Sequence, residues 1–247
     1  MIKLPKIVAV AAIAASLAAG GCSAPLSEGE ASEVTSEPAD ESHEVTGFWR
    51  HDELVSSGGD EIPLAGVFLF QDGVFIQQAV MDTPTAKNSE AMAHTGPYTI
   101  TEKGVQLTAA PTIGISITGE NPLSYQASTE HDITAQNTGD NLTLTFGSGT
   151  VQTFTRIPMS GKATIYNFGN GRLALSDDRF VLVAGNQNDV VTGYGTYTRS
   201  GDDIVFSADR WAESTDKKAE IEVDAAVEGT FDDSTLKIGD HVFTVAS

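Results

Sequence analysis

Residues 142–146 read Leu142-Thr143-Leu144-Thr145-Phe146, with a large apolar side chain at every second position. A period of two residues places these apolar side chains on one face of an extended strand. Runs rich in Val, Ile, Thr and Phe at 67–71, 74–80 and 151–157 have the same strand-forming character. No stretch after the N-terminal segment shows the 3.6-residue period of a helix, so the sequence predicts an all-β fold.

The segments between these runs indicate how the strands connect. Gln71-Asp72-Gly73 separates two apolar runs with the Asp-Gly pair that favours a tight β-hairpin. Gly147-Ser148-Gly149 indicates another hairpin turn, ahead of the run at 151–157. Short strands that follow one another with such turns are typical of an antiparallel sandwich or barrel.

Two parts of the chain share a spacing pattern. Gly96-Pro97-Tyr98-Thr99 and Gly195-Thr196-Tyr197-Thr198 are each followed by two apolar residues, nine and eleven positions after the glycine. Matched spacing indicates an internal repeat, although two β-rich segments can also resemble each other by chance. We therefore expect one β-rich domain at 47–158 and a second at 159–247, a divergent repeat of the first. Each is long enough to bury a small core.

The first domain carries two features of a known group. Gly47-Phe48-Trp49 forms a Gly-x-Trp motif at the first strand, and Arg156 lies near the end of the last. With these residues and the Gly96-Pro97-Tyr98 segment, the domain resembles the lipocalin-like (calycin) group of small bacterial domains. The resemblance implies an antiparallel up-and-down barrel of about eight strands, in which Arg156 packs across Trp49 as a structural pair.

The second domain departs from this pattern. Gly161-Lys162-Ala163 stands in place of Gly-x-Trp, and the last strand, 242–245, has no arginine. Its relationship to the first domain is inferred from the repeat alone, and it is expected to form a second barrel-like domain. An eight-stranded barrel is just wide enough to be filled by side chains or to hold one small ligand.

The N-terminus has the features of a secretion signal. Lys3 and Lys6 precede an apolar run at 7–17, which is too short to cross a bilayer core of ~30 Å. Small residues and then Cys22, the single cysteine of the chain, follow this run. The segment resembles the lipobox of bacterial lipoproteins, although Ala19 stands where Leu or Val is usual. We therefore expect residues 1–21 to be removed and Cys22 to carry acyl chains such as palmitate; the alternative is an ordinary signal peptide.

Residues 22–46 follow as an expected disordered tether. From 23 to 46 the segment contains seven acidic residues, two prolines, and no basic or aromatic residue, so it cannot bury a core. Without the signal peptide the chain has 12 basic and 34 acidic residues, and such a charge repels nucleic acid. The acidity is consistent with a cationic ligand, but a solvated surface is the simpler interpretation.

The sequence contains no recognisable catalytic or metal-binding motif. A Gly-x-Ser-x-Gly nucleophile motif is absent, and the histidines form no H-x-H or H-E-x-x-H arrangement. His51-Asp52-Glu53 and Glu130-His131-Asp132 place histidines among carboxylates, but consecutive strand residues point to opposite faces. We therefore expect no enzyme activity, no metal and no cofactor. Trp211 is expected at a strand end beside a loop, either in a contact surface or in a lid.

These observations favour a non-enzymatic lipoprotein of the cell envelope. It would be held by the acyl chains of Cys22 at the outer membrane, facing the periplasm, or at the outer face of the cell membrane where there is one membrane. The expected activity is binding of a small apolar ligand inside the first barrel, near Tyr98 and Tyr125, since tyrosine offers apolar area and a hydroxyl. The alternative is a protein with filled barrels whose loops bind an envelope protein.

Overall fold

The computed structural model describes residues 44–82 and 89–246. The chain divides into two units, Met1–Ala39 and Asp40–Ser247, and every described residue belongs to the second. The expected signal peptide, Cys22 and most of the expected tether therefore lie outside the described residues. Within the described residues the structure consists of strands and contains no helix, which confirms the all-β prediction.

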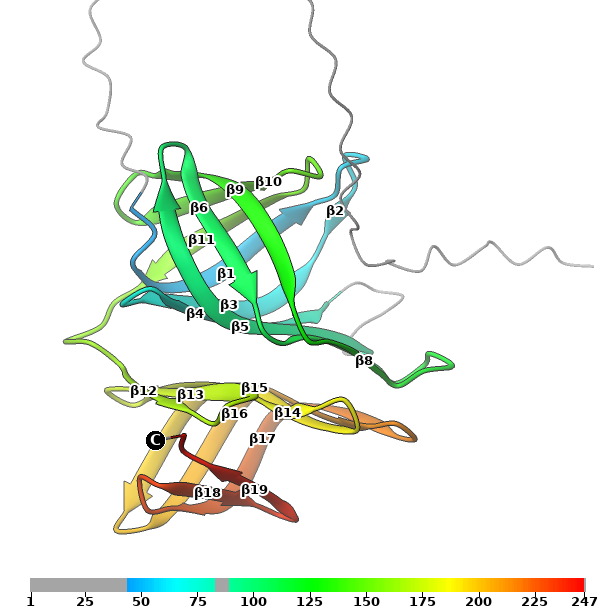
Figure 1. Cartoon of the computed structure of the whole chain (residues 1–247), viewed down its shortest axis with the longest axis vertical. Helices are drawn as coiled ribbons and strands as arrows, with labels where there is room; N and C mark the ends of the chain where they lie inside the picture. Colours follow the sequence, from blue (N-terminus) through cyan, green and yellow to red (C-terminus); the bar gives the residue numbers. More distant parts are fainter. Residues whose placement is uncertain (1–43, 83–88, 247) are drawn as a thin grey trace, which may run out of the picture. The chain divides into compact units, whose positions relative to one another are not determined.

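Eleven strands form the first sheet (Figure 1). They are β1 (Gly47–Val55), β2 (Glu61–Ile62), β3 (Leu64–Gln71), β4 (Val74–Met81), β5 (Glu90–Thr101), β6 (Gly104–Ala109), β7 (Thr112–Ser116), β8 (Leu123–Gln126), β9 (Thr129–Asn137), β10 (Asn141–Phe146) and β11 (Val151–Ile157). Their bounds include all four runs that the sequence analysis identified as strands.

Eight of these strands close into an antiparallel barrel. The order around the barrel is β1, β3, β4, β5, β6, β9, β10 and β11, and β11 pairs again with β1. Apart from the short strand β2 and the hairpin β7–β8, which pair with β1 and β5, neighbours in space are neighbours in the chain. The expected up-and-down barrel is therefore confirmed. At the β3–β4 hairpin Asp72 and Gly73 both have positive φ, as a tight Asp-Gly turn requires.

One part of the barrel interior is packed with apolar side chains. The buried residues are Val45, Trp49, Phe68, Phe70, Phe75, Tyr98, Val105, Leu107, Ala109, Ile133, Ala135, Leu142, Leu144 and Phe154. Val45 was assigned to the tether, but its side chain is fully buried in this core and its carbonyl accepts a hydrogen bond from Trp49 Nε1 at 2.8 Å. The packed core thus includes Val45, two residues before the first strand, because this residue covers Trp49.

Eight further strands form the second sheet, in simple meander order. They are β12 (Thr164–Asn167), β13 (Gly171–Ser176), β14 (Arg179–Asn186), β15 (Asp189–Ser200), β16 (Asp203–Thr215), β17 (Ala219–Phe231), β18 (Thr235–Ile238) and β19 (His241–Thr244). The sheet curls upon itself, and the N–H of Ala246, after β19, donates to the carbonyl of Asn167 in β12 at 2.6 Å. A closed barrel and a curled half-barrel agree with the expected two barrel-like domains.

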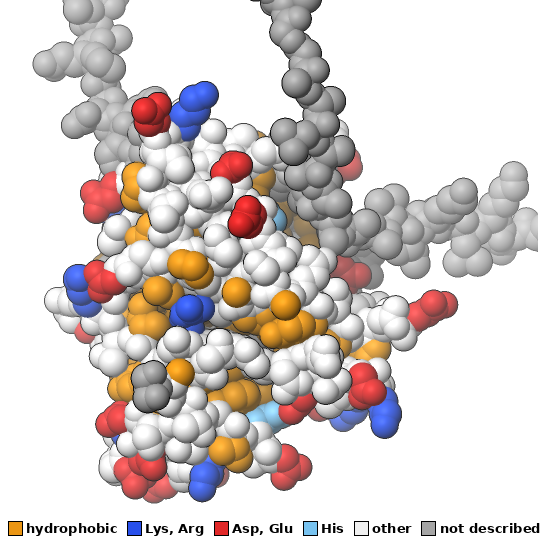
Figure 2. Space-filling view, in the orientation of Figure 1, with side chains coloured by type: hydrophobic (Ala, Val, Ile, Leu, Met, Phe, Trp, Pro, Cys, Tyr) orange, Lys and Arg blue, Asp and Glu red, His pale blue; other side chains and the backbone are white. Residues whose placement is uncertain are grey.

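The central strands of the second sheet are buried on both faces. In β14, Phe180 and Leu182 face the apolar interior of the curl, whereas Val181 and Val183 pack against the outer wall of the first barrel. A strand buried on both sides has a continuous apolar run instead of an alternating one, as 180–184 (FVLVA) shows. Figure 2 shows hydrophobic side chains gathered across the middle of the visible face.

The two sheets are joined by polar as well as apolar contacts. The Gln71 side-chain amide donates to the carbonyl of Ala163 and accepts from its N–H, both at 2.8 Å, so it pairs with Ala163 as a neighbouring strand would. Arg172 Nη1 donates to Thr95 Oγ1 at 3.1 Å. Apolar packing and these hydrogen bonds therefore hold the two sheets together.

The glycines of the expected repeat occupy matching places in the two sheets. Gly96 of β5 lies opposite Phe75 of β4, and Gly195 of β15 lies opposite Phe180 of β14. In both cases the missing Cβ lets the backbone of the following strand approach closely. The shared spacing therefore marks the same local geometry in both sheets.

Candidate functional site

Trp49 and Arg156 meet at one end of the first barrel. The Arg156 guanidinium lies over the Trp49 ring, 4.0 Å from its centroid, and the two residues are directly opposite in the β1–β11 ladder. Arg156 also donates to the carbonyls of Gly139 at 2.8 Å and Thr46 at 3.2 Å. With its donors engaged by backbone and its face by indole, Arg156 has a structural role at this barrel end.

The structure does not bring Tyr98 and Tyr125 together. Tyr98 points into the barrel core, where its ring meets Phe70 edge-on with centroids 5.2 Å apart. Tyr125 lies on β8 and packs at the junction of the two sheets, outside the barrel core. The two residues proposed for one pocket thus belong to different apolar clusters, because the β7–β8 hairpin leaves the barrel wall.

Buried polar side chains occupy another part of the barrel interior. His51 Nε2 lies 3.0 Å from Gln77 Nε2, and His94 Nδ1 lies 3.2 Å from Thr112 Oγ1. His131 packs beside His94, with ring centroids 6.2 Å apart. Burial lowers the pKa of His51 and of His94 to about 3, and it also lowers the pKa of His131, so these imidazoles are neutral at neutral pH.

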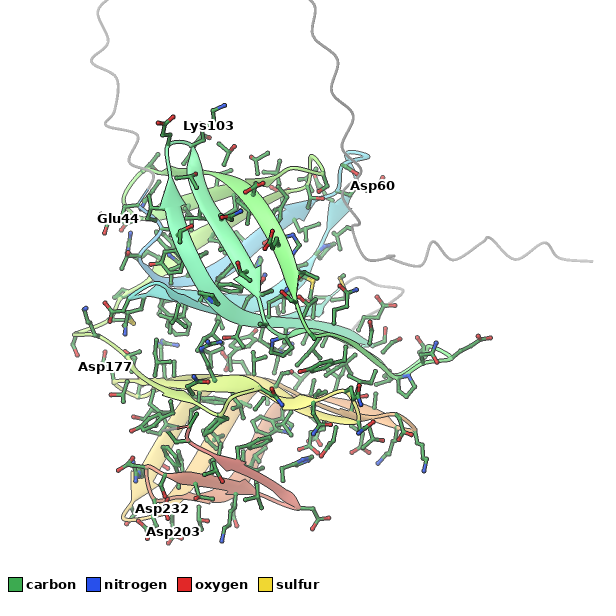
Figure 3. All side chains as sticks on the ribbon, in the orientation of Figure 1. Glu44, Asp60, Lys103, Asp177, Asp203 and Asp232 are labelled. Carbon is green, nitrogen blue, oxygen red and sulfur yellow. The ribbon has the colours of Figure 1, made fainter. Side chains whose placement is uncertain are left out.

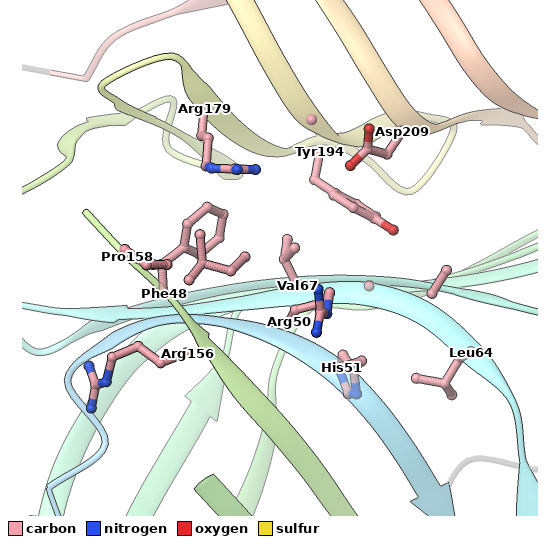
Figure 4. Close-up of a pocket in the computed structure, with 14 residues that line it drawn as sticks. Phe48, Arg50, His51, Leu64, Val67, Arg156, Pro158, Arg179, Tyr194 and Asp209 are labelled. Atoms are coloured by element: carbon pink, nitrogen blue, oxygen red, sulfur yellow. The ribbon is translucent and has the colours of Figure 1, made fainter. Parts of the chain in front are cut away.

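A cleft of about 410 Å³ lies between the barrel wall and the second sheet (Figure 4). Its lining comes from β1, β3, β11 and the residue after β11 on one side and from β14, β15 and β16 on the other: Phe48, Arg50, His51, Leu64, Ala65, Gly66, Val67, Arg156, Ile157, Pro158, Arg179, Tyr194, Gly195 and Asp209. This volume is within the range of small-molecule sites. We take this cleft as the candidate binding site.

Strand alternation explains which side chains face the cleft. Along β1, Trp49 and His51 point into the barrel, so Phe48 and Arg50 point outward toward the second sheet. Figure 4 shows Arg179, Tyr194 and Asp209 on the opposite wall. The wall from the barrel is largely apolar but also includes Arg50 and Arg156, and the wall from the second sheet includes Arg179 and Asp209.

A β-bulge places Asp209 in this wall. In the β15–β16 ladder Tyr194 is opposite Arg210 and Gly195 is opposite Ala208, so Asp209 is the extra residue. Burial raises the pKa of its carboxyl, while the nearby Arg179 and Arg210 oppose that shift. Burial likewise raises the pKa of Tyr194 to about 12, so its phenol stays protonated and can donate a hydrogen bond.

The cleft lining contains groups suited to binding. Its lining has no Ser, Thr, Cys or Lys side chain. Across 44–82 and 89–246, no three His, Cys, Asp or Glu side chains lie close enough to hold a metal ion. Guanidinium, phenol and carboxyl groups around an apolar wall can orient a small molecule by charge and hydrogen bonds.

A second cluster of ionisable groups lies in the curl of the second sheet. His241 Nδ1 lies 3.0 Å from Asp189 Oδ2, and its Nε2 lies 3.5 Å from Glu213 Oε2. Hydrogen bonding to Glu213 is the main cause that raises the pKa of His241, with Asp189 adding to it. Both ring nitrogens face carboxylates, so this histidine serves as an ionic link between strands and is not directed at a hydroxyl.

The expectation for Trp211 was wrong. Trp211 lies within β16, is buried in the core of the second sheet, and donates from Nε1 to Glu213 Oε1 at 2.7 Å. Charged residues on both sides of it suggested a loop. The bulge at Asp209 allows the strand to continue past these charges, so Trp211 is neither in a lid nor in a contact surface.

Turn carboxylates also have structural partners. Asp233 accepts from Arg199 Nη1 at 2.6 Å and from the Tyr166 hydroxyl at 3.0 Å. Asp232 accepts from the backbone of Ser234 and Thr235 in the same turn. Figure 3 shows Asp203 and Asp232 at the end of the second sheet that is away from the first barrel. These acidic turns shape the fold and are remote from the cleft.

Sequence reasoning did not identify Arg179, Tyr194 or Asp209 as site residues. Arg179 precedes the apolar run of β14 and shares a face with Val181 and Val183, which was a usable signal only once that face was known to meet the barrel. Asp209 depends on the bulge, which no local pattern announces. The cleft is thus a product of how the two sheets pack.

Compared with protein-family models, with curated proteins and with solved structures, the chain shows no match. The described residues include no helix that has both the length and the apolar character needed to cross a bilayer. The function proposed below rests on the geometry and chemistry of this chain.

Proposed function

We propose that this protein is a non-enzymatic, lipid-anchored lipoprotein of the cell envelope that binds a small molecule in the cleft between its two sheets. The observation that carries the proposal is the cleft itself, about 410 Å³, in which apolar side chains of the barrel lie beside charged and polar groups from both walls. Such a combination of shape and chemistry is typical of small-molecule sites.

The cleft is a better candidate than the barrel interior. The apolar core of the barrel is occupied by large aromatic side chains, and Phe68, Phe70, Phe75 and Phe154 are all almost fully buried. Phe68 and Phe70 stack with centroids 4.1 Å apart. A ligand there would have to displace side chains that already fill the space, whereas the cleft offers volume without such a cost.

The anchoring part of the proposal rests on the N-terminal sequence. A charged start, a short apolar run and the single Cys22 support acylation at that cysteine. Two or more acyl chains would hold the protein stably at a membrane. The acidic segment after Cys22 would then act as a spacer, and the −22 charge of the mature chain argues against nucleic acid as a partner.

The second candidate function is binding of an envelope protein through exposed loops. The filled core of the first barrel favours this alternative over a ligand held inside that barrel. The exposed apolar side chains Ile100, Ile117, Val223 and Val242 lie on separate segments of the chain. Four scattered apolar residues support a protein-binding surface less well than the cleft supports a ligand site.

Native mass spectrometry tests the ligand proposal. Residues 23–247, which retain every described residue, would be purified from a bacterial host and compared with their denatured mass. We expect a retained non-covalent mass, which is lost in Ala65→Trp because the indole fills the cleft. Ile100→Trp, at an exposed site outside the cleft lining, is the matched control.

A bare mass, with no uptake of any compound from a library of small amphiphiles, would remove the ligand proposal and leave the protein-partner alternative. Anchoring is tested separately by metabolic labelling with palmitate in the full chain. Cys22→Ser should abolish the label and release the protein from the membrane fraction; label retained in that variant would contradict the anchor.

A further inference from the structure

We infer that the ligand of the cleft is an organic anion, with an acidic group that binds Arg179 and an apolar body that lies against the barrel wall. The inference rests on the proposed function, since it names the class of ligand for the same cleft.

Arg179 differs from every other arginine of the chain. The sequence contains six arginines, all within the described residues. Five of them have partners: Arg50 with Asp52, Arg156 with Gly139 and Thr46, Arg172 with Thr95, Arg199 with Asp233, and Arg210 with a backbone carbonyl. Arg179 has no hydrogen bond or ion pair with any described residue. Arg50 and Arg179 are thus the two arginines whose donors form no hydrogen bond with described residues, and Arg179 also lacks an ion pair.

The missing ion pair of Arg179 is notable because the chain is strongly acidic. The chain has 34 acidic residues, yet no carboxylate of the described part forms an ion pair with Arg179. Asp209 is an opposite charge on the same wall, which Arg179 influences electrostatically without forming a hydrogen bond. None of the Arg179 nitrogens is sealed from solvent, so its donors are open to a ligand that enters the cleft.

The facing wall supplies a second guanidinium. Arg50 projects from β1 into the same cleft, and its only ion pair is a loose one with Asp52, 3.7 Å apart and largely exposed. Figure 4 shows Arg50 and Arg179 on opposite sides of the cleft. Arginine binds carboxylate and phosphate through two parallel N–H donors, so an acidic group entering between these walls gains charge-assisted hydrogen bonds.

The remainder of the lining suits an apolar body of modest size. Phe48, Leu64, Val67, Ile157 and Pro158 form the barrel side of the cleft. Tyr194 can add a hydrogen bond from its protonated phenol. Asp209 lies on the same wall as Arg179; burial raises the pKa of its carboxyl, and the nearby Arg179 and Arg210 oppose that shift.

Isothermal titration calorimetry with three matched amphiphiles tests the inference. Decanoate, decanol and decylamine have the same chain and differ in charge. We expect residues 23–247 to bind decanoate at least about tenfold more tightly than decanol, with decylamine weakest, because a charge-assisted pair to arginine is made only by the anion. Arg179→Gln should weaken decanoate about tenfold and leave decanol unchanged.

Lys103→Gln is the control for charge, since Lys103 lies at the tip of the β5–β6 hairpin, outside the cleft lining (Figure 3). It should leave all three affinities unchanged. Equal binding of decanoate and decanol, or an Arg179→Gln variant that still prefers decanoate, would overturn the anion inference while leaving a ligand-binding cleft. Failure of all three amphiphiles to bind, together with no retained mass in the native spectrum, would overturn both proposals.

Discussion

The guanidinium carbon of Arg156 lies 4.0 Å from the centroid of the Trp49 ring, across the ladder that closes the first barrel. The second sheet contains a comparable contact from a different strand: Arg199 lies over Phe231, 5.2 Å from the ring centroid, and donates to the Phe231 carbonyl at 2.7 Å. In each sheet a guanidinium covers one face of a buried aromatic ring and donates hydrogen bonds to nearby backbone carbonyls. The contact therefore shields the ring from solvent and gives these carbonyls hydrogen-bond partners.

Replacement of Arg156 by lysine should destabilise the protein by about 2 kcal/mol, because lysine loses both the stacking and the fixed pair of backbone hydrogen bonds. The free energy of unfolding in urea measures this loss. A double-mutant cycle with Trp49→Phe should give a coupling of roughly 0.5–2 kcal/mol. Arg50→Lys, on the outer face of β1, is the control; an equal loss in that variant would contradict the role of the stacked pair.

The protein should lose stability as the pH falls below neutral. His51 and His94 have a pKa of about 3 when folded and 6.5 in the unfolded chain, so the unfolded chain alone binds their protons between these values. The contribution of these two histidines to the free energy of unfolding is therefore complete above pH 6.5 and is lost progressively as the pH falls toward 3. The loss should be about 2 kcal/mol for each histidine between about pH 7.5 and about pH 5.

Urea unfolding at a series of pH values measures this dependence. His94→Gln should be less stable than the wild type at neutral pH, yet its stability should fall less steeply on acidification. NMR titration of the folded protein gives the same information directly, since the His51 and His94 rings should remain neutral at pH 5. Imidazole signals that titrate near 6.5 would contradict their burial.

His241 should act in the opposite sense. Glu213 and Asp189 raise its pKa, so the ionic link among β15, β16 and β19 is complete below pH 6.5 and is lost as the pH rises through the folded pKa. His241→Gln should cost roughly 1 kcal/mol near pH 6 and less near pH 9. Thermal unfolding of variant and wild type at both pH values measures the gap; a gap that widens at high pH would argue against the link.

Gly96 and Gly195 should tolerate no side chain. A Cβ at Gly96 would overlap the Thr108 carbonyl oxygen, and one at Gly195 would overlap the Ser207 carbonyl oxygen. Gly96→Ala and Gly195→Ala should each cost about 3 kcal/mol, because backbone must move to make room. Gly161→Ala, where a Cβ meets nothing within 4 Å, is the control and should change stability by less than about 0.5 kcal/mol. Comparable urea midpoints for all three variants would show that the strands can separate at low cost.

Much of the first barrel could be predicted from residues close together in the sequence. The alternation of Leu142, Leu144 and Phe146 and the positive-φ turn at Asp72-Gly73 are local properties, and the structure shows both. The prediction for Trp211 was wrong because its environment is not a local property. The charged neighbours Asp209 and Arg210 are typical of a loop, and the bulge that accommodates them depends on pairing with β15.

The candidate site could not be predicted in this way. Its walls bring strands β1 and β3 against β14, β15 and β16, more than a hundred residues away in the chain, and Phe48, Arg50, Arg179 and Asp209 carry no motif that links them. Tyr98 and Tyr125 have the right chemistry for a pocket, but packing places one in the barrel core and the other on a hairpin outside it.

The sequence alone determined the all-β fold and its division into two β-rich parts, because the period of side-chain burial along a strand and the backbone demands of turns are written in adjacent residues. The tertiary structure alone determined which faces meet, that apolar side chains fill one part of the first barrel and polar side chains another, and that Arg179 lies in a cleft without a hydrogen-bond partner among the described residues. These features depend on contacts between residues far apart in the chain, and the packing of whole sheets selects among them.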